Sequence, residues 1–298
     1  PPPAATMPAA DLLNSPPAAD PFSALSAANA ATVPSPPKPS GTVSGAAMSV
    51  EGSTPGATPQ QMAAWHARLA VNKEGVLYED SFMQIGVKTD YQGTQGKVNL
   101  FLGNKKQEAI TDLKLEVDFT PEVCGMCGNP GSVIEPRQQM QISVSVECRA
   151  AFSGSLPLSI AFAVGFERRT IRMRLPVVVA KFLSPVTLQD AAFAAKWESS
   201  AHQGSAVTVQ SNEKWCNEQT LKALMTNGLH MGVVEGRASG ALAAAATLAG
   251  VGGGEVLVEL SLADAAAKRF SLAVRASDPT LRDGMEDLVS VILQSTRK

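Results

Sequence analysis

The chain has 298 residues and a mass of 31.0 kDa, with 25 basic and 27 acidic side chains. This balance excludes a general nucleic-acid binder, which needs a strong basic excess. Four cysteines are too few for a secreted fold held by disulfides. No apolar run approaches the roughly 20 residues of a membrane-spanning helix, so insertion into a membrane is not expected.

The first segment differs in composition from the rest. Residues 1–59 hold 13 of the 20 prolines, four charged residues and one aromatic residue, Phe22. Such a segment cannot bury enough apolar surface to offset the entropy lost on ordering. We therefore predict a disordered Pro/Ala/Ser-rich hinge over residues 1–62. The start at Pro1 rather than Met predicts a fragment of a longer protein.

Apolar and polar residues alternate between residues 82 and 181. This period of two is typical of strands with one buried and one wet face. Strands are expected over residues 83–87, 97–102, 113–119, 140–148, 158–166 and 171–175. No helix is expected between them. Successive two-faced strands predict an all-β, immunoglobulin-like sandwich, assigned to residues 63–180.

The pattern changes after residue 181. Thr187 and Asp190 have the spacing of a capping box, which predicts a helix from Ala191 to Glu198. Asp278 followed by Pro279 predicts the start of a terminal amphipathic helix. Between them we expect a helix over residues 217–225 and strands over 229–234, 255–261 and 269–275. The mixture predicts a second, α+β subdomain over residues 181–298.

Cys124-Gly-Met-Cys127 has the spacing of zinc and redox motifs. A structural zinc site needs four ligands, and Cys148 and Cys216 stand apart from the pair. A redox CxxC usually lies at a strand-to-helix turn, whereas this one is expected in a loop between strands. We therefore expect no metal and no cofactor. A zinc- or redox-active protein is the alternative, and it predicts bound metal or a reactive thiol at Cys124.

Motifs of catalysis are missing from the sequence. The glycines between residues 250 and 254 lack the Lys-Ser/Thr of a phosphate-binding loop, and there is no GxSxG. His66, His202 and His230 are scattered, which disfavours a nucleophilic triad. We expect no catalytic residues and no enzymatic activity.

Two pairs of side chains are candidates for ligand binding. Phe193 and Trp197 are one helical turn apart and are expected to stack on one face of the first helix. They form either part of the core or an aromatic platform for a peptide. Arg269 and Arg275 share one face of the strand over 269–275, where they are either solvated or paired with an acidic ligand. Residue types alone leave both interpretations open for each pair.

Several segments between residues 71 and 293 carry a resemblance to a known family. They are Gly75–Glu79, Gln84–Lys88, Leu100–Lys105, Leu175–Pro185 followed by Phe193 and Trp197, and Ser277–Leu281. In this order they resemble the C-terminal ear of alpha-adaptin, the alpha large chain of the plasma-membrane clathrin adaptor complex. The last segment is similar to plant-type members. The resemblance implies a sandwich subdomain, then a platform subdomain, on a hinge from the adaptor trunk.

The same resemblance implies a function. Ears of this family bind short Asp-Pro-Phe or Asp-Pro-Trp motifs in the disordered tails of endocytic accessory proteins. The expected location is the cytoplasmic face of the plasma membrane, in clathrin-coated pits. Other adaptor subunits, reached through the trunk, and clathrin are further implied partners. An ear of another coat, such as the coatomer, is an alternative that the junction over Lys181–Trp197 disfavours.

Individual site residues follow from the family pattern. Phe193 and Trp197 match the aromatics that receive the ligand ring, and Arg275, together with Arg269, would pair with the ligand aspartate. The sequence departs from the pattern at three positions: Ala194 replaces an aromatic residue, and Ser271 and Val258 replace basic ones.

The hinge contains a tripeptide of the same type as the expected ligand, Asp20-Pro21-Phe22. A motif on the same chain would visit the site repeatedly. We therefore expect it to compete with external peptides.

Overall fold

The computed structural model describes residues 49–51, 56–199, 201–237, 241–250, 253–266 and 268–295. Contacts divide the chain into residues 1–38 and 39–298, and every described residue belongs to the second unit. Most of the predicted hinge, including Asp20-Pro21-Phe22, lies outside the described residues.

A helix that the sequence does not predict, α2 (Pro59–Val71), opens the continuous part of the fold. Thr58 and Gln61 form a capping box, since the Thr58 hydroxyl accepts from Gln61 N and Gln61 Oε1 accepts from Thr58 N. Met62 and Leu69 are buried against the rest of the fold. The predicted hinge boundary at residue 62 falls inside this helix, so residues 59–62 belong to the folded part.

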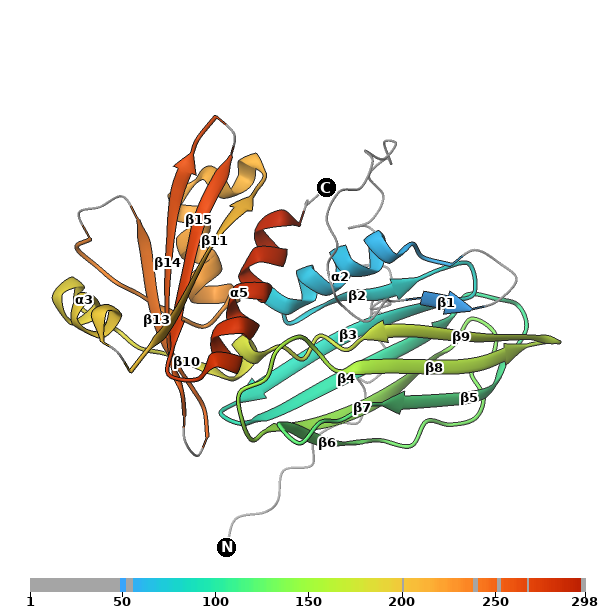
Figure 1. The fold of residues 1–298 in the computed structure, drawn as a ribbon. Coiled ribbons are helices and arrows are strands. Elements are labelled where there is room, and N and C mark those ends of the chain that lie inside the picture. Colours follow the sequence, from blue (N-terminus) through green and yellow to red (C-terminus); the bar gives the residue numbers. More distant parts are fainter. Residues whose placement is uncertain are drawn as a thin grey trace, which may run out of the picture. The chain divides into compact units, whose positions relative to one another are not determined.

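The sandwich consists of two antiparallel sheets (Figure 1). One sheet has the order β2-β3-β4-β7-β6, formed by Glu74–Glu79, Met83–Gln92, Gln95–Asn104, Gln139–Cys148 and Val123–Cys127. The other has the order β1-β9-β8-β5, formed by Ser49–Glu51, Glu167–Arg174, Pro157–Val164 and Ile110–Val117. The predicted all-β sandwich and its six strands are confirmed, whereas β1, β2 and β6 are not predicted.

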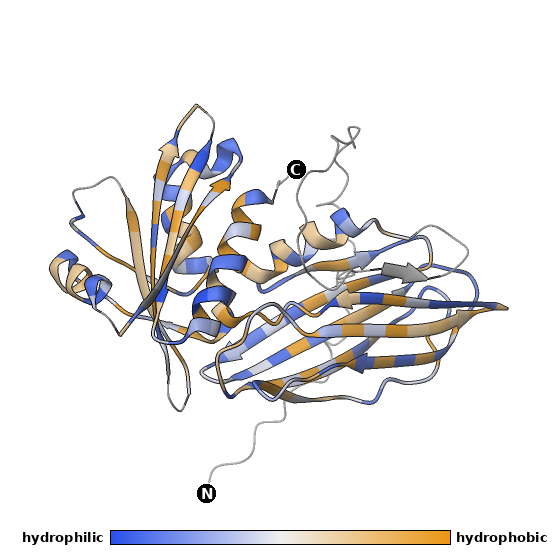
Figure 2. Ribbon diagram, viewed as in Figure 1, coloured by the Kyte–Doolittle hydropathy of each residue, from blue (hydrophilic) through white to orange (hydrophobic). Residues whose placement is uncertain are grey.

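The alternation of apolar and polar residues along each strand determines which side chains form the sandwich core. Along β7, Ile142, Val144, Val146 and Cys148 are buried, and the polar residues between them face outward. Figure 2 shows the same alternation of apolar and polar residues along neighbouring strands. The inward-facing side chains of both sheets join one hydrophobic cluster.

The second part of the chain forms a mixed platform. Its sheet has the order β10-β13-β14-β15-β11, with β12 paired to β13. These strands are Leu183–Pro185, Leu242–Leu248, Glu255–Asp264, Arg269–Ala276, Gln203–Gln210 and, for β12, Gly232–Val233. The helices are α3 (Asp190–Glu198), α4 (Glu218–Ala223) and α5 (Pro279–Gln294), with short turns η2 (Val179–Phe182), η3 (Glu213–Cys216) and η4 (Leu224–Gly228). The predicted α+β subdomain is confirmed as a fold class.

Helices α3 and α5 cover opposite faces of the platform sheet (Figure 1). Residues of α5 share a cluster with Val256 and Val258, whereas Phe193 of α3 clusters with Leu257. Successive residues of β14 point to opposite faces, so this division follows from the strand itself. The predicted start of α5 is confirmed, because the Asp278 carboxylate accepts from Thr280 N at 2.7 Å.

Several local predictions in the platform are wrong. The capping box at Thr187 is absent: Gln189 precedes α3 without a side-chain cap, and Asp190 pairs with Arg237 at 3.7 Å instead. The predicted helix over 217–225 ends at Ala223 and continues as a π turn, and the strand over 229–234 shrinks to β12. Strands β11 and β13 are not predicted. In β13 the reason is its run of alanines, which have low strand propensity.

Candidate functional site

Phe193 is the buried residue of helix α3. Phe193 is completely buried, whereas the alanines beside it are exposed. Its ring packs against Ala243, Ala245 and Leu257. Alanines at these strand positions leave room for the ring between helix and sheet. Phe193 therefore belongs to the core. Of the two interpretations that the sequence left open, core or platform, the structure supports the core for this residue.

Trp197 lies one turn after Phe193 and is half-buried. The two rings stack, with centroids 5.4 Å apart and planes inclined by 23°. The predicted stacking is confirmed, and Trp197 is the member of the pair with accessible surface.

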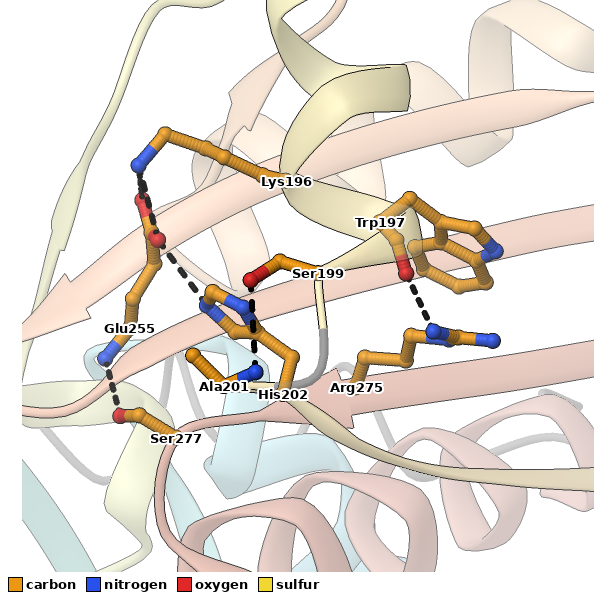
Figure 3. Close-up of polar contacts among 8 residues, drawn as sticks. All are labelled: Lys196, Trp197, Ser199, Ala201, His202, Glu255, Arg275 and Ser277. Carbon is orange, nitrogen blue, oxygen red and sulfur yellow. Dashed lines mark hydrogen bonds and ion pairs between the residues drawn. The ribbon is translucent and has the colours of Figure 1, made fainter.

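A guanidinium group lies over each ring of this pair. The Cζ atom of Arg275, on β15, lies 5.0 Å from the Trp197 ring centroid, and that of Arg237 lies 4.9 Å from the Phe193 centroid. Arg275 Nη1 also donates to the Trp197 carbonyl, at the C-terminal end of α3 (Figure 3). Sequence reasoning missed Arg237, because it lies in an irregular segment that carries no periodic signal.

Arg237 ties the start of α3 to the sheet. Its guanidinium pairs with Asp190 of α3 and with Glu259 of β14. Arg237 also lines a pocket of about 650 Å³, together with Leu221, Leu260 and Phe270. A substitution of Arg237 would therefore alter two regions at once.

Glu255 holds the other end of α3. Lys196 Nζ lies 2.9 Å from both carboxylate oxygens of Glu255, and His202 Nε2 lies 3.0 Å from Glu255 Oε2 (Figure 3). Ser277 Oγ in turn accepts from the Glu255 amide at 3.0 Å. The last turn of α3, which carries Trp197, is thus anchored to β14 by Lys196 and to β15 by Arg275.

Arg269 is not part of this cluster. It shares the strand face of Arg275, as predicted, but lies six residues away, which is roughly 20 Å along a strand. It is exposed and paired in register with Gln210 and Asp264. The structure therefore brings together Phe193, Trp197 and Arg275 and leaves Arg269 at the far end of β15.

The three departures from the family pattern have different surroundings. Ala194 is exposed on α3, and Ser271 is partly buried on the sheet face of Arg275. Val258 is completely buried in the cluster that contains α5, on the opposite face of the sheet. A basic residue at position 258 would point into the core, so Val258 removes nothing from the surface around Trp197.

The cysteine motif lies on a strand and not in the predicted loop. Cys124 and Cys127 both belong to β6 and pair in register with Glu147 and Val144. Residues three apart on a strand point to opposite faces and are about 10 Å apart, beyond the reach of a disulfide or of a shared zinc ion. Among the described residues no group of three His, Cys, Asp or Glu side chains is arranged to hold a metal.

Two of the thiols are made less reactive by burial. Burial raises the pKa of Cys127, and it raises the pKa of Cys148 to about 11. Cys124 Sγ donates to Glu147 Oε2 at 3.4 Å, and the same carboxylate oxygen accepts from Arg149 at 3.3 Å. The raised pKa values of Cys127 and Cys148 and the opposite orientations of Cys124 and Cys127 argue against the redox alternative.

None of the helices in the described part of the chain is long and apolar enough to cross a membrane.

Comparison with known proteins gives the family. Residues 73–173 match the adaptin C-terminal domain. The AP-2 complex subunit alpha-2 of Dictyostelium discoideum is 31% identical over 191 residues, which cover 61% of this chain and 19% of that protein. The AP-2 complex subunit alpha-1 of Arabidopsis thaliana is 29% identical over 143 residues, which cover 45% of this chain and 13% of that protein.

A solved structure with partial similarity is the GAE domain of yeast GGA1, at 14% identity and a TM-score of 0.31 over 35% of this chain and 99% of that domain. The chain spans about a fifth or less of the length of the curated relatives it matches. Adaptin appendages are non-enzymatic adaptor modules, in agreement with the expectation of no enzymatic activity. The match over residues 73–173 and the similarity to AP-2 alpha subunits together support an alpha-adaptin ear domain, that is, an adaptor appendage.

Proposed function

We propose that the α3 face of the platform binds short Asp-Pro-Phe or Asp-Pro-Trp motifs of endocytic accessory proteins during clathrin-mediated endocytosis. The observation that carries this proposal is the half-buried Trp197 ring with the Arg275 guanidinium over it, on one face of the platform sheet. An aromatic surface next to a cation suits a ligand with an aromatic and an acidic side chain.

Each group has a separate role in the proposed complex. Trp197 contacts the ligand ring, and Arg275 pairs with the ligand carboxylate. Among the described residues Arg275 donates to a single acceptor, the Trp197 carbonyl, and its other N–H groups remain for a carboxylate. A Cβ at Gly204 would lie 3.1 Å from Arg275 Nε, so this glycine lets the arginine side chain extend across β11.

The surface around this pair predicts weak binding. Ala194 offers no second aromatic contact, and small side chains such as Ser271 and Ala273 form the neighbouring sheet face. A motif of three residues buries little area, so affinity is expected near the micromolar range or weaker. Several ears facing tails with several motifs gain strength through effective concentration.

The wider setting is part of the same proposal. Because the matched relatives are alpha subunits of AP-2, the ear would work with the other adaptor subunits and with clathrin. The location would be clathrin-coated pits on the cytoplasmic face of the plasma membrane.

Calorimetric titration of the full chain with an Asp-Pro-Trp peptide tests the proposed site. Trp197→Ala should abolish measurable binding, and Arg275→Gln should weaken it roughly ten-fold. Arg269→Gln is the matched control, since it makes the same change on the same strand outside the cluster, and it should bind like the wild type.

The peptide itself provides the second arm. If Arg275 pairs with the ligand carboxylate, an Ala-Pro-Trp peptide should bind Arg275→Gln and the wild type with nearly equal affinity. Equal losses for Arg275→Gln and Arg269→Gln, or no binding of the wild type at millimolar peptide, would overturn the proposal.

A further inference from the structure

Strand β9 (Glu167–Arg174) carries an unusual series of arginines. The side chains of Arg169, Ile171 and Met173 face the core, where the Arg169 guanidinium lies 3.6 Å from the buried Asp80 carboxylate. The alternate positions 168, 170, 172 and 174 face outward, and three of these four are arginines. Arg168 and Arg172 are exposed.

The residues of the neighbouring strand β8 beside these arginines have small side chains. On β8, the residues opposite Arg168, Thr170 and Arg172 are Ala163, Ala161 and Ser159. All three are small. Arg168 pairs with Asp112 at 3.9 Å, and both side chains are more than two-thirds exposed, so water screens this pair. The outer face beside β9 is therefore a basic stripe.

The backbone edge of β9 already accepts an added strand. On the side away from β8, β9 pairs with β1 (Figure 1). Strand β1 consists of three residues and comes before the continuous part of the fold. Ser49, Val50 and Glu51 lie opposite Arg172, Ile171 and Thr170. The register of β1 thus covers three of the eight residues of β9.

We propose that the outer edge of β9 is a strand-addition site for an extended acidic peptide of a partner protein, which displaces the chain's own β1. Main-chain hydrogen bonds would supply affinity, and alternate side chains would supply specificity. A partner with acidic residues at every second position places them along Arg168 and Arg172, whereas Arg174 already donates to the Ser155 carbonyl at 2.6 Å.

The competition between β1 and the partner follows from length and tethering. Because β1 is part of the same chain, its effective concentration at the edge is high. A strand of three residues forms few hydrogen bonds, so a peptide that pairs along most of β9 and contacts the arginines can displace it. This site is on the sandwich, away from Trp197 on the platform, and it is independent of the proposed Asp-Pro-Phe/Trp site.

Fluorescence anisotropy with the full chain tests the proposal. The probe is a labelled eight-residue peptide of alternating Val and Glu. Val50→Pro removes a backbone donor from β1 and opens the edge, so the peptide should bind roughly ten-fold more tightly. Ser49→Pro is a second variant with the same expected effect. The double variant Arg168→Glu/Arg172→Glu should weaken binding at least ten-fold.

A matched control is Lys88→Glu/Lys97→Glu, which makes the same charge change on the other sheet of the sandwich and should leave binding unchanged. Hydrogen exchange supplies the structural readout. Amides of residues 170–172 should exchange faster in Val50→Pro and slow again when the peptide is added.

Three outcomes would overturn the proposal. Binding that does not change in either proline variant would mean that β1 does not occupy the site. Equal loss in the lysine control would show unspecific attraction to charge. Binding of the arginine face to phosphatidylserine vesicles, without binding of the peptide, would assign the stripe to a membrane surface.

Discussion

Single residues at the α3 face have structural roles beside the binding roles proposed for them. Arg275 both covers the Trp197 ring and donates to the carbonyl of the same residue. Glu255 accepts from Lys196 and lies against His202, next to the turn that carries Trp197. The position of the indole therefore depends on residues that need not touch a ligand.

Glu255→Gln should loosen the last turn of α3. The neutral amide keeps the shape but loses its charge interaction with Lys196, which is partly exposed and contributes less than about 1 kcal/mol. We expect the amides of residues 194–199 to exchange faster by a few-fold, with peptide affinity reduced by a similar factor. Glu213→Gln, at an exposed ion pair with Lys268, is the control that should change neither.

Elements differ in how well the sequence predicts them. Strands with strict alternation, such as β7, and the helix capped by Asp278 are predicted correctly, because one strong local signal decides each. Helix α2 and strand β13 are missed. Helix α2 carries a local signal, the capping box of Thr58 and Gln61, but it lies at the end of a segment assigned to the hinge by its composition. Strand β13 is rich in alanine, and tertiary burial rather than local pattern fixes its conformation.

The proposed binding cluster of Phe193, Trp197 and Arg275, with Arg237 beside it, is predictable from the sequence only in part. The spacing of Phe193 and Trp197 gives their stacking directly. Arg237 reaches Phe193 from a distant irregular segment, which no periodicity marks. Arg269 and Arg275 share a strand face, but sequence spacing alone does not tell which end of the strand lies under α3.

Helix α2 should make the fold sensitive to acid. Desolvation lowers the pKa of His66 to about 4, although a hydrogen bond with the Leu175 backbone opposes the shift. The unfolded state, with a pKa near 6.5, binds the proton more readily. The stability contribution of the neutral ring is thus complete above pH 6.5 and is lost as pH falls towards 4, by up to about 3 kcal/mol.

Chemical denaturation of His66→Phe between pH 7.5 and 4 tests this effect. The variant should show a flatter dependence of the unfolding free energy on pH than the wild type. Trp65→Phe, a change without titration in the same helix, should keep the slope of the wild type. Parallel curves for His66→Phe and the wild type would contradict the assignment.

At the scale of the whole molecule, the two expected subdomains share close contacts. Residues 39–298 form one unit by their contacts, and Lys181 Nζ at the junction donates to the Asn72 carbonyl at 3.2 Å. A Cβ at Gly284 of α5 would lie 2.6 Å from the Phe152 carbonyl of the sandwich part. The glycine allows backbone to approach backbone at this joint.

Gly284→Ala should therefore destabilise the protein, although alanine is favoured by about 1 kcal/mol inside an exposed helix. The clash with a backbone carbonyl cannot be relieved by a side-chain rotation, and we expect a net loss of about 1–3 kcal/mol. Val291→Ala, at an exposed position of the same helix, should change the unfolding free energy by less than about 0.5 kcal/mol. If Gly284→Ala raised the midpoint of thermal denaturation, the close backbone contact between Gly284 and Phe152 would be refuted.

The hinge motif Asp20-Pro21-Phe22 remains a prediction at this scale. Competition by a motif on the same chain lowers the apparent affinity for an external peptide. The double variant Asp20→Ala/Phe22→Ala should therefore bind an Asp-Pro-Trp peptide more tightly in calorimetry. Asp11→Ala/Leu12→Ala is the control, and equal affinities for both variants would discard the competition.

The pairing of β1 with β9 also sets the reach of the ear. With β1 in place, the chain is attached to the sandwich at Ser49–Glu51. Release of β1 would move this attachment to Thr58, where α2 is capped, and would add nine residues, or up to about 32 Å of contour length. In the proposed adaptor, a partner that takes the edge of β9 would thereby enlarge the volume in which the ear searches for its next ligand.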